Sequence, residues 1–283
     1  MRAPTLQDAL VVSELTSRYS PEPFPVEMVE REWTEPNFQL ADDARLLDGA
    51  YASVWDDRGG RAWLDFQGPP PDELFDWAEA RAIAKGLPLV RGGTWDQNAA
   101  VKSAFETRGY ELIRHSYRMH IELDRVPQEP VWPDGLTVRP FRAGDEQRFY
   151  KVHQESFADH WGHEVDTPYD EWAHWFLQPP MFEPELWFVA EEDGEPAGLA
   201  IDYVREETEP IGWIQILGVR RPWRRRGLGR ALLLHAFAAF RERGLRQAGL
   251  GVDASNPTGA TRLYESVGMQ VSSRFDIYEK QLA

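Results

Sequence analysis

The chain contains no cysteine, and this absence excludes a whole range of chemistry. Without thiols it can form no disulfide, no thiolate metal site and no covalent intermediate on cysteine. Long hydrophobic runs are also absent, because no apolar stretch approaches the roughly 18 to 20 residues of a membrane helix. The first residues, MRAPTLQDALVV, lack the apolar core of a secretory signal. We therefore expect a cytoplasmic protein with no membrane partner and no metal site.

Positive charge is scarce, since 31 Lys and Arg stand against 47 Asp and Glu and give a net charge of −16. Most of such a surface repels a phosphate backbone, so we expect no nucleic-acid partner, and small molecules or cationic partners fit better. With 42% hydrophobic residues over 283 positions, the chain can build one large core or two ordinary ones.

A proline-rich segment divides the chain. Residues 123–135, LDRVPQEPVWPDG, carry three prolines and no amphipathic period, which is typical of a linker. We expect one domain over 1–128 and another over 134–283. In the second, periodicity and turn residues predict strands from 136 and over 211–219, 248–255 and 271–282, with a hairpin over 186–204. They also predict helices over 144–157, 230–241 and 256–269, and a loop over 157–166. The last of these helices is expected to have Asn256 as its N-terminal cap and Pro257 as its first residue.

The stretch LGVRRPWRRRGLGRALL, residues 217–233, places six arginines and three glycines between a strand and a helix. A helix N-terminus exposes unpaired N–H groups and a positive dipole end, so it stabilises an anion. Gly227 and Gly229 remove the Cβ atoms that would keep a phosphate away, and Arg224 to Arg226 add attraction. The pattern favours a pyrophosphate cradle. The alternatives are a solvated basic face and a nucleic-acid patch.

Two motifs in this region resemble those of the GNAT superfamily of N-acetyltransferases. VRRPWRRRGLG resembles its acyl-CoA-binding pattern Q/R-x-x-G-x-G/A, and LGVDASNPTGATRLYESVGM resembles its second motif, which carries Asn and L-Y-x-x-x-G-F/M. The matching residues are Arg224, Gly227, Gly229, Asn256, Leu263, Tyr264, Gly268 and Met269. The resemblance covers 134–283. It implies an α/β fold in which a mixed, mostly antiparallel twisted sheet is flanked by helices.

The same resemblance implies acetyl-CoA as co-substrate and a role for each motif residue. Backbone amides of the turn would hold the pyrophosphate, the strand edge before it would pair with the pantetheine arm, and Asn256 would bond to that arm. Tyr264 would protonate the departing thiolate, although a helix tyrosine can also merely pack. The expected acetyl-CoA-binding residues are Leu217, Gly218, Val219, Arg224, Arg225, Arg226, Gly227, Leu228, Gly229, Arg230, Asn256 and Tyr264.

The general base departs from the family pattern. Many GNAT enzymes use a glutamate on the strand before the cradle, but here that strand, GWIQIL, has no ionisable side chain. The candidates are Asp253, Asp202, His160 and His163. Histidine has the best-placed intrinsic pKa, whereas a lone loop histidine is more often a packing or surface residue.

Charge is distributed unevenly over the second domain. Residues 131–219 hold five Lys and Arg against 19 Asp and Glu, whereas 220–283 hold 12 against five. A cationic acceptor would be drawn to the first segment and anionic CoA to the second, unless the acids only solubilise the surface. Four tryptophans could line an aromatic acceptor pocket or fill a core: Trp161, Trp172, Trp175 and Trp187.

The first domain reads as a degenerate copy of the second. Aligning Gly109 with Gly268 puts Phe105 where Tyr264 stands, so the acid hydroxyl is missing. The cradle is replaced by residues 67–80, which carry four acids and no Lys or Arg. We therefore expect two tandem GNAT-like domains, of which only the second is catalytic.

Such a tandem is similar to that of the mycothiol synthases, whose pre-cradle glutamate corresponds to Trp213. The expected activity is acetyl transfer to a primary amine of a small, possibly cationic acceptor by direct ternary-complex transfer. The acceptor classes left open are mycothiol precursors, antibiotics, polyamines and proteins. A non-catalytic acyl-CoA sensor is the alternative, and the protein is expected to be a monomer or homodimer.

Overall fold

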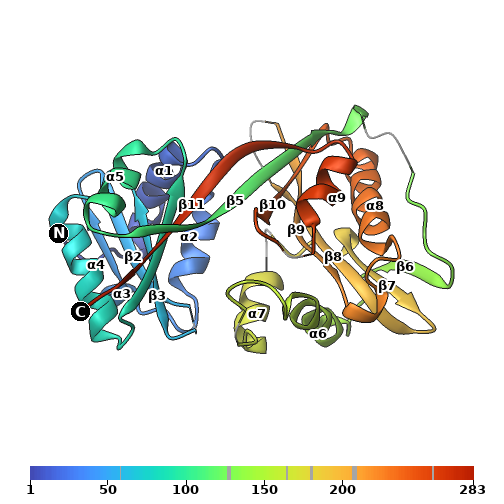
Figure 1. Cartoon of the computed structure of the whole chain (residues 1–283), viewed down its shortest axis with the longest axis horizontal. Helices are drawn as coiled ribbons and strands as arrows, with labels where there is room; N and C mark the ends of the chain where they lie inside the picture. Colours follow the sequence, from blue (N-terminus) through green and yellow to red (C-terminus); the bar gives the residue numbers. More distant parts are fainter. Residues whose placement is uncertain (58, 126–128, 164, 179–180, 206–208, 257) are drawn as a thin grey trace. The chain divides into compact units, whose positions relative to one another are not determined.

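The computed structural model describes residues 1–57, 59–125, 129–163, 165–178, 181–205, 209–256 and 258–283. They form two compact units: unit 1 comprises Met1–Tyr117 with Ser273–Ala283, and unit 2 comprises Arg118–Ser272 (Figure 1). These units differ from the expected division into 1–128 and 134–283, because strands β5 (Glu111–Glu122) and β11 (Gln270–Gln281) each contribute to both units. Positions 126–128 of the expected linker lie outside the described residues.

Unit 2 is built on a sheet with the strand order β5-β10-β9-β8-β7-β6. Its further strands are β6 (Leu136–Pro140), β7 (Trp187–Glu192), β8 (Glu195–Arg205), β9 (Ile211–Val219) and β10 (Gln247–Asp253). β6 to β9 pair antiparallel, and β10 pairs parallel to β9. A parallel neighbour requires a crossover, which here is helix α8 (Leu228–Glu242). The predicted mixed, mostly antiparallel sheet is confirmed.

Helices cover both faces of this sheet because successive side chains of a strand point to opposite sides. Trp187 and Val189 of β7 pack with α6 (Glu146–Phe157) and α7 (Tyr169–Phe176) in one core cluster. Phe188 and Ala190 pack with α8 in another. Helix α9 (Ala260–Ser266) follows β10 and lies beside α8 (Figure 1).

Two local expectations were wrong. The sequence analysis did not predict α7, which follows the predicted loop over 157–166. The last short helix begins at Ala260 rather than at the expected Pro257, a position outside the described residues. Asn256 caps a turn instead: its Oδ1 accepts bonds from N and Oγ1 of Thr258, and the helix starts after Gly259, whose φ is 75°.

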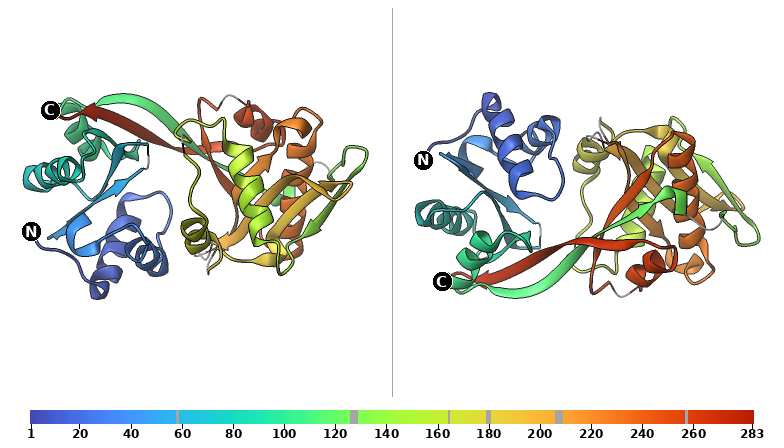
Figure 2. Two further views of the ribbon diagram at one scale, coloured as in Figure 1. Left: turned by 90° about the horizontal axis from the view of Figure 1, so that it is seen from below. Right: turned by 90° about the horizontal axis from the view of Figure 1, so that it is seen from above.

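Unit 1 has the strand order β1-β2-β3-β4-β11. The strands are β1 (Ala44–Leu47), β2 (Ala50–Asp56), β3 (Arg61–Gln67) and β4 (Leu89–Trp95), of which only β3 and β4 pair in parallel. Figure 2 shows α1 (Ala9–Tyr19) and α2 (Val26–Trp33) on one side of the strands, and α4 (Asp72–Ala84) and α5 (Ala99–Thr107) on the other. Shorter helical segments are α3 (Leu40–Asp43) and the 3-10 turns Leu6–Asp8, Leu123–Arg125, Pro184–Leu186 and Arg221–Trp223.

Phe105 of α5 is fully buried in unit 1. Its ring stacks on Tyr278 with centroids 5.1 Å apart and meets Phe75 edge-on at 5.3 Å. A Cβ on Gly92 of β4 would lie 2.7 Å from the same ring. The space beside β4 is therefore filled by packed aromatic side chains.

Asp202 of β8 is an acid with zero exposure, and neither of its carboxylate oxygens has a hydrogen-bond partner among the residues that the structure describes. Burial raises its pKa well above the ordinary value, so the folded protein keeps the proton on this carboxyl to higher pH than the unfolded chain does. The unfolded chain releases that proton above pH ~3.9.

Stability should therefore fall as pH rises above about 4, by up to about 1.4 kcal/mol per pH unit, until the folded-state pKa is passed. Asp202→Asn should remove this component and exceed the wild type in unfolding free energy at pH 7. Urea unfolding between pH 4 and 8 measures it, with Asp193→Asn in the exposed β7–β8 turn as the control. Parallel pH curves for Asp202→Asn and the wild type would contradict the assignment.

Candidate active site

The site opens where strands β9 and β10 separate. Their parallel pairing runs from Gln247–Ile211 to Leu250–Ile214 and goes no further, although β9 continues to Val219 and β10 to Asp253. The diverging ends line a cleft of about 610 Å³. Backbone groups of β9 that face the gap are no longer paired to β10, so they can bond to a ligand.

The arginine-rich turn closes one end of this cleft. The turn passes through two left-handed residues, Arg225 with φ 62° and Gly227 with φ 90°, and Gly227 caps the N-terminus of α8. A Cβ on Gly229 would meet Leu263 at 3.5 Å and Val219 at 3.7 Å, which are ordinary contacts. The protein itself therefore leaves room for a side chain at 229, and glycine there keeps the helix terminus bare toward the cleft. This arrangement fits a pyrophosphate.

Arg224 and Arg226, which were expected to add attraction for a phosphate, are both paired with carboxylates of the protein. Arg224 donates to the carbonyls of Val219 and Ser156 at 3.0 Å each and pairs with Asp159 at 2.8 Å. Arg226 pairs with Glu192 at 2.6 Å.

Arg226 does not line the cleft, although its place in the motif predicted contact with the pyrophosphate; its ion pair draws the side chain to the β7–β8 hairpin. Arg225 is exposed and lines the cleft. The turn is therefore fixed by ion pairs, and Arg225 presents a cation to the cleft.

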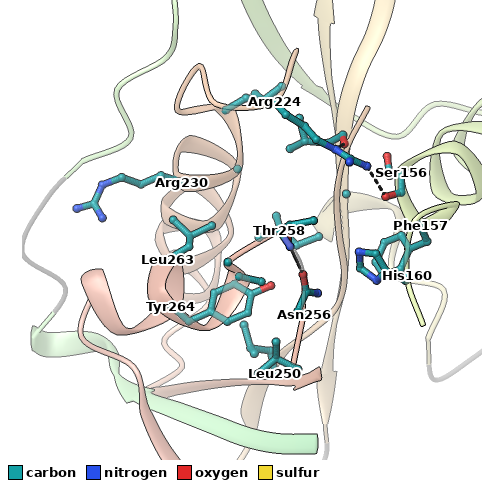
Figure 3. A pocket seen from close by; sticks show the side chains of 18 of the residues that line it. Ser156, Phe157, His160, Arg224, Arg230, Leu250, Asn256, Thr258, Leu263 and Tyr264 are labelled. Carbon is teal, nitrogen blue, oxygen red and sulfur yellow. Dashed lines mark hydrogen bonds between the residues drawn. The ribbon is translucent and has the colours of Figure 1, made fainter. Parts of the chain in front are cut away.

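Tyr264 of α9 lies on the other wall, with its hydroxyl directed into the cleft (Figure 3). It is 7% exposed, and burial raises the pKa of its phenol to about 12. The hydroxyl therefore stays protonated at neutral pH and can donate a proton. Asn256 stands near it, and His160 faces both from the segment after α6.

Two of the four candidate bases reach the cleft, His160 and Asp253. Burial lowers the pKa of His160, and the Arg224 charge lowers it further, against an opposing effect of Asp253. The imidazole is therefore neutral near pH 7 and able to accept a proton. His163 pairs with Asp166 at 3.1 Å outside the residues that line the cleft.

Asp202 is wrong as a base candidate, because it is fully buried and does not line the cleft. The pre-cradle glutamate of the resemblance is replaced by Trp213, which is 3% exposed and donates from Nε1 to Gln215 at 3.1 Å. Arg118 and Arg205 lie over its ring, with guanidinium carbons 5.1 and 4.4 Å from the centroid.

The four tryptophans proposed for an acceptor pocket do not line the cleft. Trp172 and Trp187 are buried in the core cluster under α6 and α7, whereas Trp161 is 38% exposed. The interpretation as core residues is the correct one for Trp172 and Trp187.

Sequence reasoning missed the end of α6 as part of the site. Ser156, Phe157 and Asp159 line the cleft. Ser156 is 3% exposed, and its Oγ has no hydrogen-bond partner among the described residues, so α6 brings an unsatisfied hydroxyl to the cleft. Behind the cleft wall, a Cβ on Gly251 would collide with the guanidinium of Arg118, a residue that does not itself line the cleft.

The remaining lining residues belong to β9, the Arg221–Trp223 turn, α8, β10 and the α9 region: Ile214, Gln215, Leu217, Gly218, Val219, Trp223, Leu228, Arg230, Leu250, Val252, Thr258, Gly259, Ala260 and Leu263. No group of three or more His, Asp or Glu within the described ranges could hold a metal ion.

Comparison with known proteins identifies this cleft. The model of the Acetyltransferase (GNAT) family matches residues 146–269, a range that contains every residue lining the cleft. The mycothiol acetyltransferase of Thermobispora bispora is 33% identical over 236 residues, which are 75% of this chain and 77% of that protein. The chain belongs to the GNAT acetyltransferase family.

Solved structures show the tandem GNAT fold. The GCN5-related N-acetyltransferase of Sphaerobacter thermophilus is 30% identical with a TM-score of 0.75, covering 99% of this chain and 94% of that one. A tandem GNAT protein from the clavulanic acid biosynthesis pathway is 14% identical with a TM-score of 0.70, covering 99% and 97%, and supports the fold alone. The protein is thus a GNAT acyltransferase with two tandem domains. None of its described helices is long and apolar enough to cross a membrane.

Two glycines of the GNAT turn make opposite predictions. Gly229→Ala should leave unfolding free energy unchanged or raise it by up to ~1 kcal/mol, because alanine favours helix and meets only ordinary contacts. It should weaken CoA binding at least ~10-fold by placing a methyl on the bare helix terminus.

Gly227→Ala should destabilise the fold by about 1 kcal/mol, because φ is 90°. Denaturant unfolding and calorimetric CoA titration separate the two effects, and normal CoA affinity in Gly229→Ala would contradict the cradle.

Proposed function

We propose that unit 2 transfers the acetyl group of acetyl-CoA to a primary amine of a small acceptor, by direct attack within a ternary complex. The observation that carries the proposal is the cleft between β9 and β10, which joins an anion-binding helix terminus to a protonated Tyr264 and a neutral His160. Acetyl-CoA supplies the activated acyl group.

Different parts of the cleft offer groups suited to different parts of acetyl-CoA. The N–H groups from Arg225 to Arg230, with the side chain of Arg225, would hold the pyrophosphate. The free edge of β9 at Leu217 to Val219 would pair with the amides of the pantetheine arm, as an added strand does. Asn256 and the unsatisfied Oγ of Ser156 offer further polar contacts.

Proton movement is divided between two side chains. His160 would take a proton from the acceptor ammonium, and Tyr264 would give a proton to the departing thiolate as the tetrahedral intermediate collapses. Both are in the protonation state that these roles require at neutral pH, for the reasons of burial given above. Asp253 is the alternative base.

The acceptor is proposed to be a small amine. The homology to mycothiol acetyltransferases favours a mycothiol precursor, and the acidic balance of residues 131–219 favours a cation. Unit 1 is proposed to be non-catalytic, because the buried Phe105 takes the position of Tyr264. Asp72 and Asp76 stand in the first turns of α4, where unit 2 has its cradle.

The mechanism departs from the family at Trp213, which replaces the usual glutamate. Thiol release from acetyl-CoA against a panel of polyamines, aminoglycosides, amino acids, peptides and cysteinyl glucosaminyl-inositol tests the proposed acceptor. Turnover on one of these classes supports a small-amine acceptor, whereas micromolar CoA binding without turnover across the panel would contradict it.

Tyr264→Phe should lower kcat by roughly 10² or more, because the phenol proton is lost while the ring remains. The CoA dissociation constant should stay within about threefold of the wild type, since no phosphate contact changes. Initial rates and calorimetry measure the two quantities. A kcat equal to that of the wild type would remove Tyr264 from the mechanism.

The acid limb of log kcat/KM against pH should lie below ~6.5, because the folded protein lowers the pKa of His160 and the base stays unprotonated to lower pH. His160→Gln should lower kcat/KM by roughly 10² and abolish that limb. His174→Gln, on α7 and outside the cleft, is the matched control and should retain the wild-type profile, because His174 is not among the groups that act on His160. An unchanged profile in His160→Gln would transfer the base role to Asp253.

A further inference from the structure

We propose that Asp159 is a positioning residue, which couples occupancy of the cradle to the placement of His160, so that donor binding prepares the acceptor side. The inference rests on the proposed function and adds a means by which one half of the site controls the other. It follows from three observations: the ion pairs of Asp159, the contacts of Arg224, and the local structure around His160.

Asp159 is held by two arginines of the cradle turn. Arg221 bonds to both carboxylate oxygens, with Nε at 2.8 Å from Oδ2, and Nη1 of Arg224 lies 2.8 Å from the same Oδ2. One carboxylate therefore ties the segment after α6 to both sides of the Arg221–Trp223 turn.

Arg224 extends this connection to the cleft walls. Its Nε donates to the carbonyl of Val219 at the end of β9, and its Nη2 donates to the carbonyl of Ser156 at the end of α6, at 3.0 Å each. Val219 and Ser156 both line the cleft. A movement of this guanidinium is thus transmitted to β9, α6 and Asp159 together.

His160 follows Asp159 in the chain, and local contacts with Phe157 fix its position. Its backbone N–H donates to the carbonyl of Phe157 at 2.8 Å, and its ring lies 4.3 Å from the Phe157 centroid. The charged groups acting on the imidazole are Arg224 of the cradle, Asp253 of β10 and His163 of its own loop. Asp159 is therefore joined to His160 by the peptide bond, and by an ion pair to the arginine whose charge acts on that imidazole.

The ion pairs are partly exposed, which makes them adjustable. The side chains of Asp159, Arg224 and Arg221 retain 27%, 25% and 68% exposure. Ion pairs of this kind are individually weak, so a second anion in the cradle can compete for the same guanidinium groups. A pyrophosphate beside Arg224, which lines the cleft, would compete with Asp159 for this guanidinium and shift the segment that carries His160.

The test follows the imidazole of His160 in the full chain while coenzyme A is added. Side-chain NMR of histidine-labelled protein is assigned by the signal missing in His160→Gln. In the wild type, saturating coenzyme A should shift this signal and its titration midpoint. In Asp159→Asn, coenzyme A should still bind within about fivefold, but the shift should disappear and kcat should fall about tenfold with the KM for acetyl-CoA nearly unchanged.

Glu155→Gln is the matched control, because Glu155 pairs with the neighbouring Arg220 and does not line the cleft. It should keep the wild-type response of His160. Arg221→Gln removes the ion pair between Arg221 and Asp159 at its more exposed partner. It should weaken the response of His160 even if Asp159→Asn folds poorly.

The outcomes are distinct. A His160 signal that responds to coenzyme A equally in the wild type, Asp159→Asn and Arg221→Gln would overturn the coupling, as would equal kcat losses in Asp159→Asn and Glu155→Gln. Coenzyme A that binds the wild type without moving His160 would overturn the coupling alone. Failure of coenzyme A to bind the wild type would overturn the proposed function as well.

Discussion

The separation of β9 from β10 after the Leu250–Ile214 pair is the constraint on which the site depends. While the strands are paired, their backbone groups are satisfied and no ligand can enter between them. Once they diverge, one strand edge becomes available for bonding, and the gap exposes residues from both strands and from the flanking helices. The anion-binding terminus of α8 and the buried hydroxyl of α9 become parts of one site only because the gap lies between them.

The arginine-rich turn has two physical tasks. A turn that runs through left-handed residues at 225 and 227 needs support, and carboxylates of α6, the segment after it and the β7–β8 hairpin provide that support through ion pairs with Arg220, Arg221, Arg224 and Arg226. The excess of acidic residues before the turn and the excess of arginines within it are therefore partly explained by the same ion pairs. Much of this charge fixes the position of the helix terminus, which leaves the proposed contact with the pyrophosphate to the unpaired N–H groups and Arg225.

Local patterns predicted the parts of the site that are local in the chain. The glycines at 227 and 229 and the tyrosine at 264 sit in short motifs whose spacing specifies strand, turn and helix, and the structure places all three at the cleft. Asn256 was correctly predicted to lie at the cleft, but it forms a turn with Thr258 rather than the expected helix cap. An Asx turn and a helix cap begin with the same residue types, so the sequence does not distinguish them.

The partners of these residues were not predictable in the same way. Ser156 and Asp159 reach the cleft from a segment far away in sequence from the arginine-rich turn, and no periodicity encodes which carboxylate meets which arginine. Trp172 and Trp187 could not be assigned from the sequence either, because a tryptophan ring suits both a ligand pocket and a core. Their burial in the structure decides between the two. The two compact units differ in their bounds from the expected domains for a related reason, since a proline-rich segment marks a gap between elements but not the strand pairing on either side.

The exchange of strand ends has a consequence for biosynthesis. Unit 1 contains the end of β11, where Arg91 and Glu279 form an ion pair across 188 positions of the chain. Loop closure over such a distance is slow and costs conformational entropy, so the sheet of unit 1 cannot be completed during synthesis of the first half. Until β11 leaves the ribosome, β4 presents an unpaired edge, which is a site for aggregation. A ribosome that stops before β11, or a protease that removes this strand, would thus disturb the unit whose other strands were made first.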